Sequence, residues 1–282
     1  MKRILYLDAF AGVSGDMFVG ALLDAGADLE AVRCNVKSLG LAGFEIRATK
    51  VLRQGLRGTK FDVLDPVTGQ NVDKRHDHGE GSGLEYYHGQ DHHHHGDDCR
   101  HDQWDHVHRN LKEIRQIIRE CTLPPEVASD VISLFELLGR AEASAHGVEI
   151  DQVHFHEVGA LDTIVDFVAA SSALMQLNVD EVWCSPIHVG SGVVTCAHGV
   201  LPVPAPATLE ILRGIPIYST DVKGELATPT GAALVKHFCT GFGPMPPLMI
   251  DTVGYGAGTR DFGIPNLLRA TVGTLVEQKT KS

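Results

Sequence analysis

The sequence predicts an α/β fold, with a mixed α+β arrangement as the alternative, in a single large domain interrupted by a mobile His-rich insertion. Three observations predict it. A buried-strand pattern at residues 4–7 leads through a glycine-containing loop into a helical pattern at 17–25. Helical and strand patterns then alternate along most of the 282 residues. The composition, 43% hydrophobic and 21% charged, is that of a globular chain long enough to bury a core.

The first part of the chain reads as compact α/β structure. Gly26 is expected to end the first helix, and a second helix follows over residues 28–40. Its apolar face consists of Leu29, Val32, Val36 and Leu39. Alternating patterns predict strands over 44–48 and 60–64.

The same periodicities resume after the insertion. The expected helices span 107–120, 124–146 (entered through Pro124-Pro125), 158–177, 206–213 and 229–238. The expected extended segments are 154–156, a set of strands and tight turns over 181–204, and two strands at 248–253 and 267–276.

Residues 66–105 differ in composition from the rest of the chain. The stretch 76–108 holds ten His, six Asp and two Glu against one Arg, so it supplies −7 of the formal net charge of −12. Too few apolar residues are present to offset the entropy of ordering the chain, so we expect a mobile insertion. The expected organisation is a domain formed by 1–65 and 106–276, the insertion over 66–105, and a tail over 277–282.

The N-terminal sequence and the net charge indicate where the protein is located and which partners it has. The first apolar run is four residues, whereas a secretory signal needs ~7–15. The six cysteines form no C-x-x-C motif, and no apolar stretch suits a membrane helix. We therefore expect a cytoplasmic protein without a membrane or nucleic-acid partner, since phosphate backbones need a basic surface. The sequence is compatible with a homo-oligomer.

The first candidate site lies between the first strand and the first helix. Ser14 and Gly15 open the helix, where free N–H groups can bind a phosphate. Asp8, at the carboxyl end of the strand, and Asp16 could hold a hard cation or act in catalysis. The pattern lacks the endings of a nucleophile elbow and of a P-loop. An ordinary strand–turn–helix is the alternative.

The most specific candidate site spans residues 154–166. His154 and His156 alternate onto one face of an extended segment, and Asp162 and Asp166 share a face of the following helix. With Glu157, they could form a transition-metal site or an acid/base cluster. The alternative is a helix N-terminus with two packed histidines. The spacing is not that of H-E-x-x-H, which excludes a zincin.

Two weaker patterns add candidate ligands. His188 and His198 lie in the strand-rich region, and His198 is a candidate metal ligand or a loop histidine. Thr228 and Thr230 flank a proline at a helix start and form a second candidate phosphate cradle or an ordinary N-cap. The insertion centres on four candidate nickel, copper, cobalt or zinc ligands, namely His92, His93, His94 and His95.

Several blocks together resemble the nickel-insertion proteins of nickel-pincer cofactor biosynthesis, the LarC family. These blocks are Leu5–Met17, His154–Asp166, His198–Thr208, Glu225–Leu234, and Pro265-Asn266 with Arg269. The resemblance implies insertion of Ni²⁺ into a pyridinium mononucleotide with two thiocarboxylate groups, a cofactor used by lactate racemase. It implies CTP with Mn²⁺ or Mg²⁺, and a C-terminal CTP-associated domain, separately encoded in some members, that this chain does not include.

The residues and the resemblance join in one hypothesis. The insertion collects nickel, and His154 and His156 receive it with one of the nearby carboxylates. The phosphate of the substrate binds at one of the two helix starts, and a carboxylate accepts the proton released when the nickel–carbon bond forms. The alternatives are a non-enzymatic nickel store or chaperone, and a metal-dependent phosphoester hydrolase. The apo racemase that uses the cofactor is an expected partner.

Overall fold

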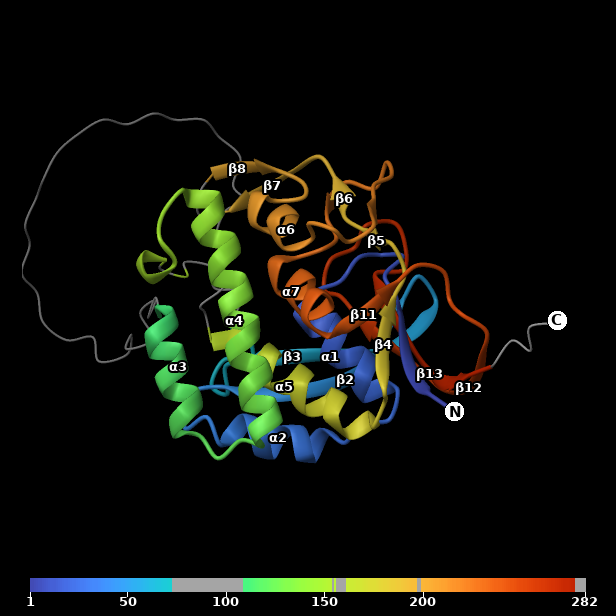
Figure 1. Ribbon diagram of the computed structural model, residues 1–282, viewed down its shortest axis with the longest axis horizontal. Helices are drawn as coiled ribbons and strands as arrows, with labels where there is room; N and C mark the ends of the chain where they lie inside the picture. The colour runs from blue at the N-terminus through green and yellow to red at the C-terminus, as the bar shows by residue number, and fades with distance from the viewer. Residues whose placement is uncertain (73–108, 154, 156–160, 197–198, 277–282) are drawn as a thin grey trace, which may run out of the picture.

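The computed structural model describes residues 1–72, 109–153, 155, 161–196 and 199–276. A seven-stranded sheet in the order β11-β4-β1-β13-β12-β3-β2 is its framework (Figure 1). Its strands are β1 (Arg3–Asp8), β2 (Glu45–Arg53), β3 (Leu56–Leu64), β4 (Glu181–Cys184), β11 (Cys239–Phe242), β12 (Leu248–Ala257) and β13 (Leu267–Leu275). The predicted α/β class is confirmed, and the sheet mixes parallel and antiparallel pairs.

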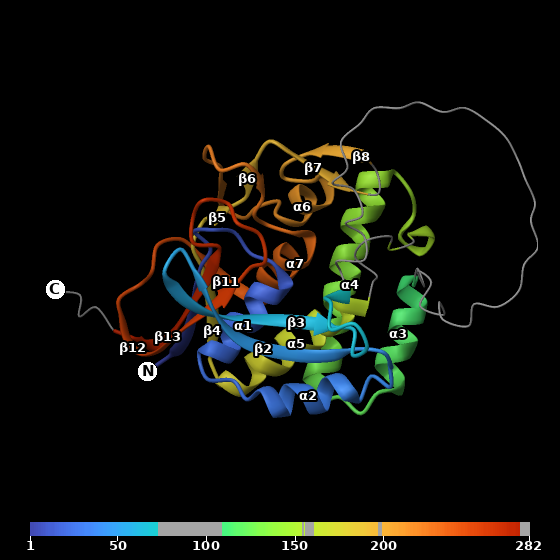
Figure 2. The same cartoon turned by 180° about the vertical axis from the view of Figure 1, so that it is seen from behind.

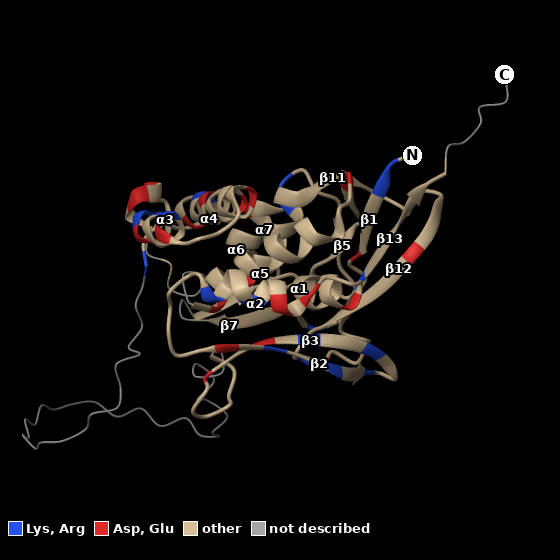
Figure 3. Ribbon diagram, turned by 90° about the horizontal axis from the view of Figure 1, so that it is seen from below, with Lys and Arg blue, Asp and Glu red and all other residues tan. Residues whose placement is uncertain are grey.

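Helices lie on one side of the curved sheet, as Figure 3 shows from below. They are α1 (Gly15–Asp24), α2 (Leu29–Lys37), α3 (Leu111–Glu120), α4 (Pro125–His146), α5 (Leu161–Leu177), α6 (Pro206–Ile211), α7 (Pro229–Phe238) and the 3-10 helix η2 (Ile150–Gln152). Within the described residues, no helix has both the length and the apolar character needed to cross a membrane.

Three short strand pairs complete the described structure. They are β5 (Ile187–His188) with β9 (Ile217–Tyr218), β6 (Gly190–Ser191) with β10 (Gly224–Glu225), and β7 (Val193–Cys196) with β8 (Gly199–Pro202). The predicted strand-rich region, 181–204, is therefore confirmed: β4 belongs to the main sheet, and the short strands β5 to β8 pair outside it.

The directions of the strands define one common edge of the sheet. β11, β4, β1, β12 and β3 run the same way, while β13 and β2 run against them. We call the end where β1, β4 and β12 finish the carboxyl edge, at Asp8, Cys184 and Ala257. α1 leaves β1 at this edge, and α5 and α7 lead into the parallel strands β4 and β11, so all three helices begin there. Open α/β sheets bind ligands at such an edge.

Glycines bring α1 directly onto the sheet. A Cβ atom on Gly20 would overlap the carbonyl oxygen of Thr59, and one on Gly256 would overlap that of Met17. This close approach buries the apolar face of α1, including Phe18 and Leu22, which are fully inaccessible. The start of α1 is consequently held in a fixed position over β3 and β12.

An aromatic group fixes α5 against α4. The ring centroid of Phe135 lies 4.9 Å from that of Phe167 and 5.9 Å from that of Phe155, both in edge-on arrangements. All three side chains are buried. Because Phe155 precedes α5 and Phe167 lies within it, this packing holds the first turns of the helix toward the carboxyl edge.

Three strand predictions, 44–48, 60–64 and 248–253, were too short, and β9, β10 and β11 lie outside every predicted strand. β2 and β3, each of nine residues, form a hairpin around Gln54 and Gly55 (Figure 2). The φ angles of these two residues, 48° and 83°, suit the tight turn. Exposed Leu52 and Leu56 hid the alternation that predicts a strand. β11 was missed because it follows α7 without a turn signal. The predicted insertion, 66–105, lies outside the described residues from residue 73 onward, while residues 66–72 are described and Asn71 forms a bridge with Leu64.

Candidate functional site

The loop after β1 is joined by backbone contacts to the segment that enters α7. The Val13 N–H donates to the Leu226 carbonyl at 3.0 Å, and the Thr228 N–H donates to the Val13 carbonyl at 3.0 Å. Gly12 has a φ of 84°, and a Cβ atom there would overlap Leu226. The two predicted phosphate cradles are therefore neighbours in the structure.

The starts of α1 and α7 meet α5 at this place. A Cβ atom on Gly15, the first residue of α1, would overlap the Asp166 carboxylate of α5 and lie 2.9 Å from Cγ2 of Thr230 on α7. The structure thus brings together Gly15, Asp166 and Thr230 from three separate parts of the chain. The positive ends of the α1 and α7 dipoles face a carboxylate there, which stabilises its negative charge.

The two predicted caps differ in their hydrogen bonds. Thr228 caps α7 as predicted, because its Oγ1 accepts from the Gly231 N–H at 3.2 Å. The prediction that Ser14 caps α1 through its side chain is wrong, since its hydroxyl donates to the Asp16 carboxylate instead. Asp16 in turn accepts from the Met17 N–H at 2.8 Å. Asp16, rather than Ser14, therefore accepts a backbone hydrogen bond in the first turn of α1.

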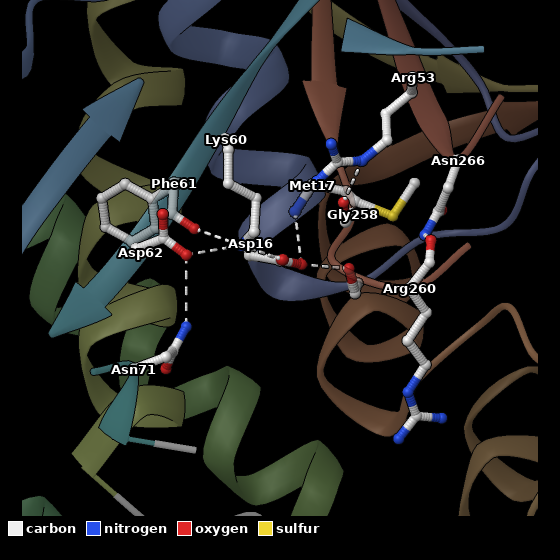
Figure 4. Close-up of polar contacts among 11 residues, drawn as sticks. Asp16, Met17, Arg53, Lys60, Phe61, Asp62, Asn71, Gly258, Arg260 and Asn266 are labelled. Carbon is white, nitrogen blue, oxygen red and sulfur yellow. Dashed lines mark hydrogen bonds and ion pairs between the residues drawn. The ribbon is translucent and has the colours of Figure 1, made fainter. Parts of the chain in front are cut away.

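A buried lysine neutralises Asp16. Lys60 of β3 is 5% exposed, and its Nζ lies 2.7 Å from Oδ2 of Asp16 and 3.1 Å from Oδ1 of Asp62 (Figure 4). It also donates to the Phe61 carbonyl at 2.7 Å, and Asn71 donates to Asp62 at 3.3 Å. Burial lowers the pKa of Lys60, but the two carboxylates more than offset this, so the net pKa is raised and the ammonium stays charged.

Asp8, the last residue of β1, is paired with an arginine. Asp8 and Arg269 are direct partners across β1 and β13, and Nη2 of Arg269 donates to Oδ2 of Asp8. Burial lowers the pKa of Arg269, but Asp8 and then Tyr255 more than offset this, so the net pKa is raised. Burial, followed by the Asp8 charge, raises the pKa of Tyr6 to about 12. Asp8 is thus the negative centre of a group of tyrosines and one arginine.

His188 supports the same loop, a role the sequence did not indicate. Its Nδ1 lies 3.1 Å from the Phe10 carbonyl and its Nε2 lies 2.9 Å from Oγ1 of Thr220. Its ring stacks on Tyr218 with centroids 4.8 Å apart. Burial lowers its pKa, and the Phe10 contact opposes this only partly, so the ring is neutral at pH 7. No local motif marks this residue, because all its partners are distant in sequence.

A hollow lies beside this support. It has a volume of about 650 Å³ and is lined by residues 220–223 and 261–264. Residues 220–226 connect it to the helix starts, since Thr220 contacts His188 and Leu226 contacts Gly12. The volume is within the range of small-molecule sites.

The remaining predicted site residues divide into two groups. Asp162 lies in the first turn of α5, on the helix that also carries Asp166. The predicted residues His154, His156, Glu157, His198, His92, His93, His94 and His95 lie outside the described part of the chain. Within the described part, no group of three or more His, Cys, Asp or Glu side chains is arranged to hold a metal. The predicted metal ligands therefore stay predictions.

Comparison with known proteins indicates a family. A family model described as "Nickel insertion protein" matches residues 5–282. Three relatives are each named "Pyridinium-3,5-bisthiocarboxylic acid mononucleotide nickel insertion protein". The one from Desulfitobacterium hafniense (strain DSM 10664 / DCB-2) is 46% identical over 98% of this chain and 60% of its own length. Those from Geobacillus kaustophilus and Acetivibrio thermocellus are 43% and 42% identical, over 96% and 98% of this chain and 60% and 62% of their own.

The chain spans about 60% of the length of these relatives. No solved structure shows a significant match to it.

Proposed function

The chain belongs to the nickel insertion protein family, and from this premise we propose that it inserts nickel into pyridinium-3,5-bisthiocarboxylic acid mononucleotide. The product is the nickel-pincer cofactor that the family resemblance links to lactate racemase. Nickel is a substrate in this reaction. The observation that carries the proposal is the meeting of Gly15, Asp166 and Thr230 at the carboxyl edge.

The helix starts suit the phosphate of the mononucleotide. Backbone N–H groups and helix dipoles at the starts of α1 and α7 favour a bound anion. Ser14 and Thr230 place hydroxyl groups at these two starts. The Asp166 carboxylate would repel a phosphate alone, so it supports a complex in which a divalent cation lies beside the substrate.

A carboxylate is also needed for the chemical step. When nickel bonds to the ring carbon, the C–H bond breaks, its electron pair forms the nickel–carbon bond, and one proton leaves. We assign acceptance of this proton to Asp166, with Asp162 and Glu157 as the other candidates. Asp166 is favoured because it lies against Gly15 at the helix start proposed for the phosphate.

Nickel delivery is assigned to the histidines. His154 and His156, which lie a few residues before α5 in sequence, would hold nickel at the site, with His198 as a further candidate. The four histidines at 92–95 would collect it. The soft sulfur atoms of the substrate would then draw nickel away from these harder nitrogen and oxygen ligands.

Asp8 and Asp16 do not fit the hard-cation site expected for Mn²⁺ or Mg²⁺ with CTP. Each carboxylate already faces a protein cation, Arg269 and Lys60 respectively. We therefore derive no step through CTP or its metal. A separately encoded C-terminal domain, the apo racemase, a homo-oligomeric state and a cytoplasmic location are proposals from the sequence and the family resemblance alone.

The proposal is tested by supplying nickel, CTP and the thiocarboxylated mononucleotide to the protein, with and without the C-terminal part of a family member. Cofactor formation is measured by activation of an apo racemase. We expect activation with the wild-type protein and its loss in the His154→Ala and His156→Ala variants. Normal nickel transfer by both variants would contradict the assigned nickel site, and turnover of a generic phosphoester would favour a hydrolase.

A further inference from the structure

Arg269 and Asp8 form a recognition group at the carboxyl edge that the nickel and phosphate assignments leave unused. Asp8 ends β1 and begins the loop that leads to Ser14, so the pair lies at the carboxyl edge. It projects from the face of the sheet opposite α1, because Gly254 and Gly256, on either side of Tyr255, are the residues of β12 that contact this helix. The side chain of Arg269 is 38% exposed and that of Asp8 is 21% exposed. The pair is therefore accessible to a ligand and only partly buried.

The surroundings of Arg269 hold its guanidinium in place. Asp8 is its direct neighbour on β1, and Tyr255 is its direct neighbour on β12. The hydrogen bond from Nη2 to Asp8 fixes one end of the planar group. An arginine held in this way loses little conformational freedom when it binds a ligand.

One donor of this guanidinium has nothing to bind. Among the described residues, the Nε–H of Arg269 is buried and makes no hydrogen bond. Buried donors in folded proteins are almost always paired, so this guanidinium has unused hydrogen-bonding capacity, and a ligand would reach it through the exposed part of the side chain rather than at the buried Nε–H. A planar anion such as a carboxylate or thiocarboxylate matches the adjacent donors of a guanidinium.

The neighbouring side chains suit the ring that would carry such an anion. Tyr218, which is 39% exposed, lies close enough to Asp8 for the carboxylate to raise its pKa after burial, the larger cause. Tyr255 lies on the other side of the pair, opposite Arg269. Aromatic faces attract a cationic ring such as pyridinium.

We propose that Arg269 recognises one of the two ring thiocarboxylates of the substrate, and that Asp8 acts as the positioning residue for its guanidinium. The inference rests on the proposed function, because it names the part of the same mononucleotide that this pair binds. It gives Asp8 a role other than the cation binding predicted from the sequence.

The test compares two mononucleotide probes, pyridinium-3,5-dicarboxylate mononucleotide and its 3,5-dicarboxamide analogue. Both carry the same phosphate and ring, and they differ in the anionic groups. Binding of each is measured by calorimetry for the wild-type protein, Arg269→Lys and a control, Arg47→Lys. Arg47 also pairs with a carboxylate, Glu45, but lies on β2. Arg269→Lys keeps a positive charge beside Asp8, which protects folding, while removing the planar donors.

We expect the wild-type protein and Arg47→Lys to bind the dicarboxylate about 10- to 100-fold more tightly than the dicarboxamide, the usual strength of a charge-assisted pair. Arg269→Lys should lose most of that preference while binding the dicarboxamide as before. An unchanged preference in Arg269→Lys, or equal weakening of both probes, would overturn the inference and leave the proposed function intact. Failure of the wild-type protein to bind either probe would overturn both.

Discussion

The Asp166 carboxylate lies where a Cβ atom on Gly15 would project, so α5 delivers a negative charge to the first turn of α1. This contact joins two sequence blocks that were predicted as separate sites. It also places a candidate proton acceptor beside a candidate phosphate-binding helix start, which is the geometry that the proposed reaction needs.

Gly15→Ala should disrupt this contact. The added methyl group would overlap Asp166, and such overpacking typically lowers the free energy of unfolding by about 1–3 kcal/mol. Gly139→Ala on α4 is the matched control, because its Cβ would meet Ile150 and Phe155 at an ordinary 3.4 Å. Chemical denaturation measures both variants. Equal stability of Gly15→Ala and Gly139→Ala would contradict the described packing.

Lys60→Met should destabilise the protein through its two carboxylate partners. Removing the ammonium leaves Asp16 and Asp62 without their shared cation. Breaking a fully buried pair costs about 3–5 kcal/mol, and we expect about 2–3 kcal/mol here because both carboxylates are partly exposed.

Lys50→Met provides the control for this measurement. Lys50 pairs with Asp24, but its side chain is 48% exposed, so the expected loss is below about 1 kcal/mol. Urea unfolding of both variants gives the comparison. A loss for Lys60→Met no greater than that for Lys50→Met would show that Asp16 does not depend on the lysine.

His188 should make the stability of the protein depend on pH. Its pKa in the folded protein lies below 6.5, the value for an unperturbed histidine, so the unfolded chain binds the proton more readily. The stabilisation that His188 contributes is present above pH 6.5 and declines as the pH falls below it. The difference in unfolding free energy between the wild-type protein and His188→Asn should therefore shrink from pH 7.5 to pH 5. A constant difference would contradict burial of the neutral ring.

Deletion of residues 76–101 separates nickel collection from nickel insertion. This segment contains most of the histidines predicted to collect nickel. We expect the deletion variant to bind much less nickel in equilibrium dialysis but to insert nickel normally when the metal is saturating. Loss of insertion at saturating nickel would place the segment in the reaction itself, and a protein whose only activity is nickel storage would show no insertion in either form.

Local sequence patterns predicted the helices well and the sheet less well. α1 and α5 were expected from their apolar residues, and α7 from its cap and its proline, signals that act within a few residues. The extent of the β2–β3 hairpin depends on cross-strand pairing of exposed residues such as Leu52 and Leu56, which carries no clear local signal.

The candidate site shows the same division. The sequence identified Ser14, Gly15, Thr228 and Thr230 from helix-start signals, and it identified Asp166 from its spacing. It did not identify Lys60 as the partner of Asp16 or Arg269 as the partner of Asp8, because these pairs form only when distant strands align. These two ion pairs change the interpretation of the site, since both aspartates predicted to bind a hard cation already face protein cations.

The most direct test of the account measures nickel incorporation into the thiocarboxylated mononucleotide by the wild-type protein, Asp166→Asn and Asp130→Asn, at saturating nickel. Asp130 is a control carboxylate on α4 that pairs with His237. If Asp166 accepts the proton, Asp166→Asn should insert nickel about 10²–10⁴-fold more slowly while still binding nickel and the mononucleotide, and Asp130→Asn should match the wild-type rate. A wild-type rate of insertion by Asp166→Asn would contradict the central claim that the chemistry occurs where α1, α5 and α7 begin.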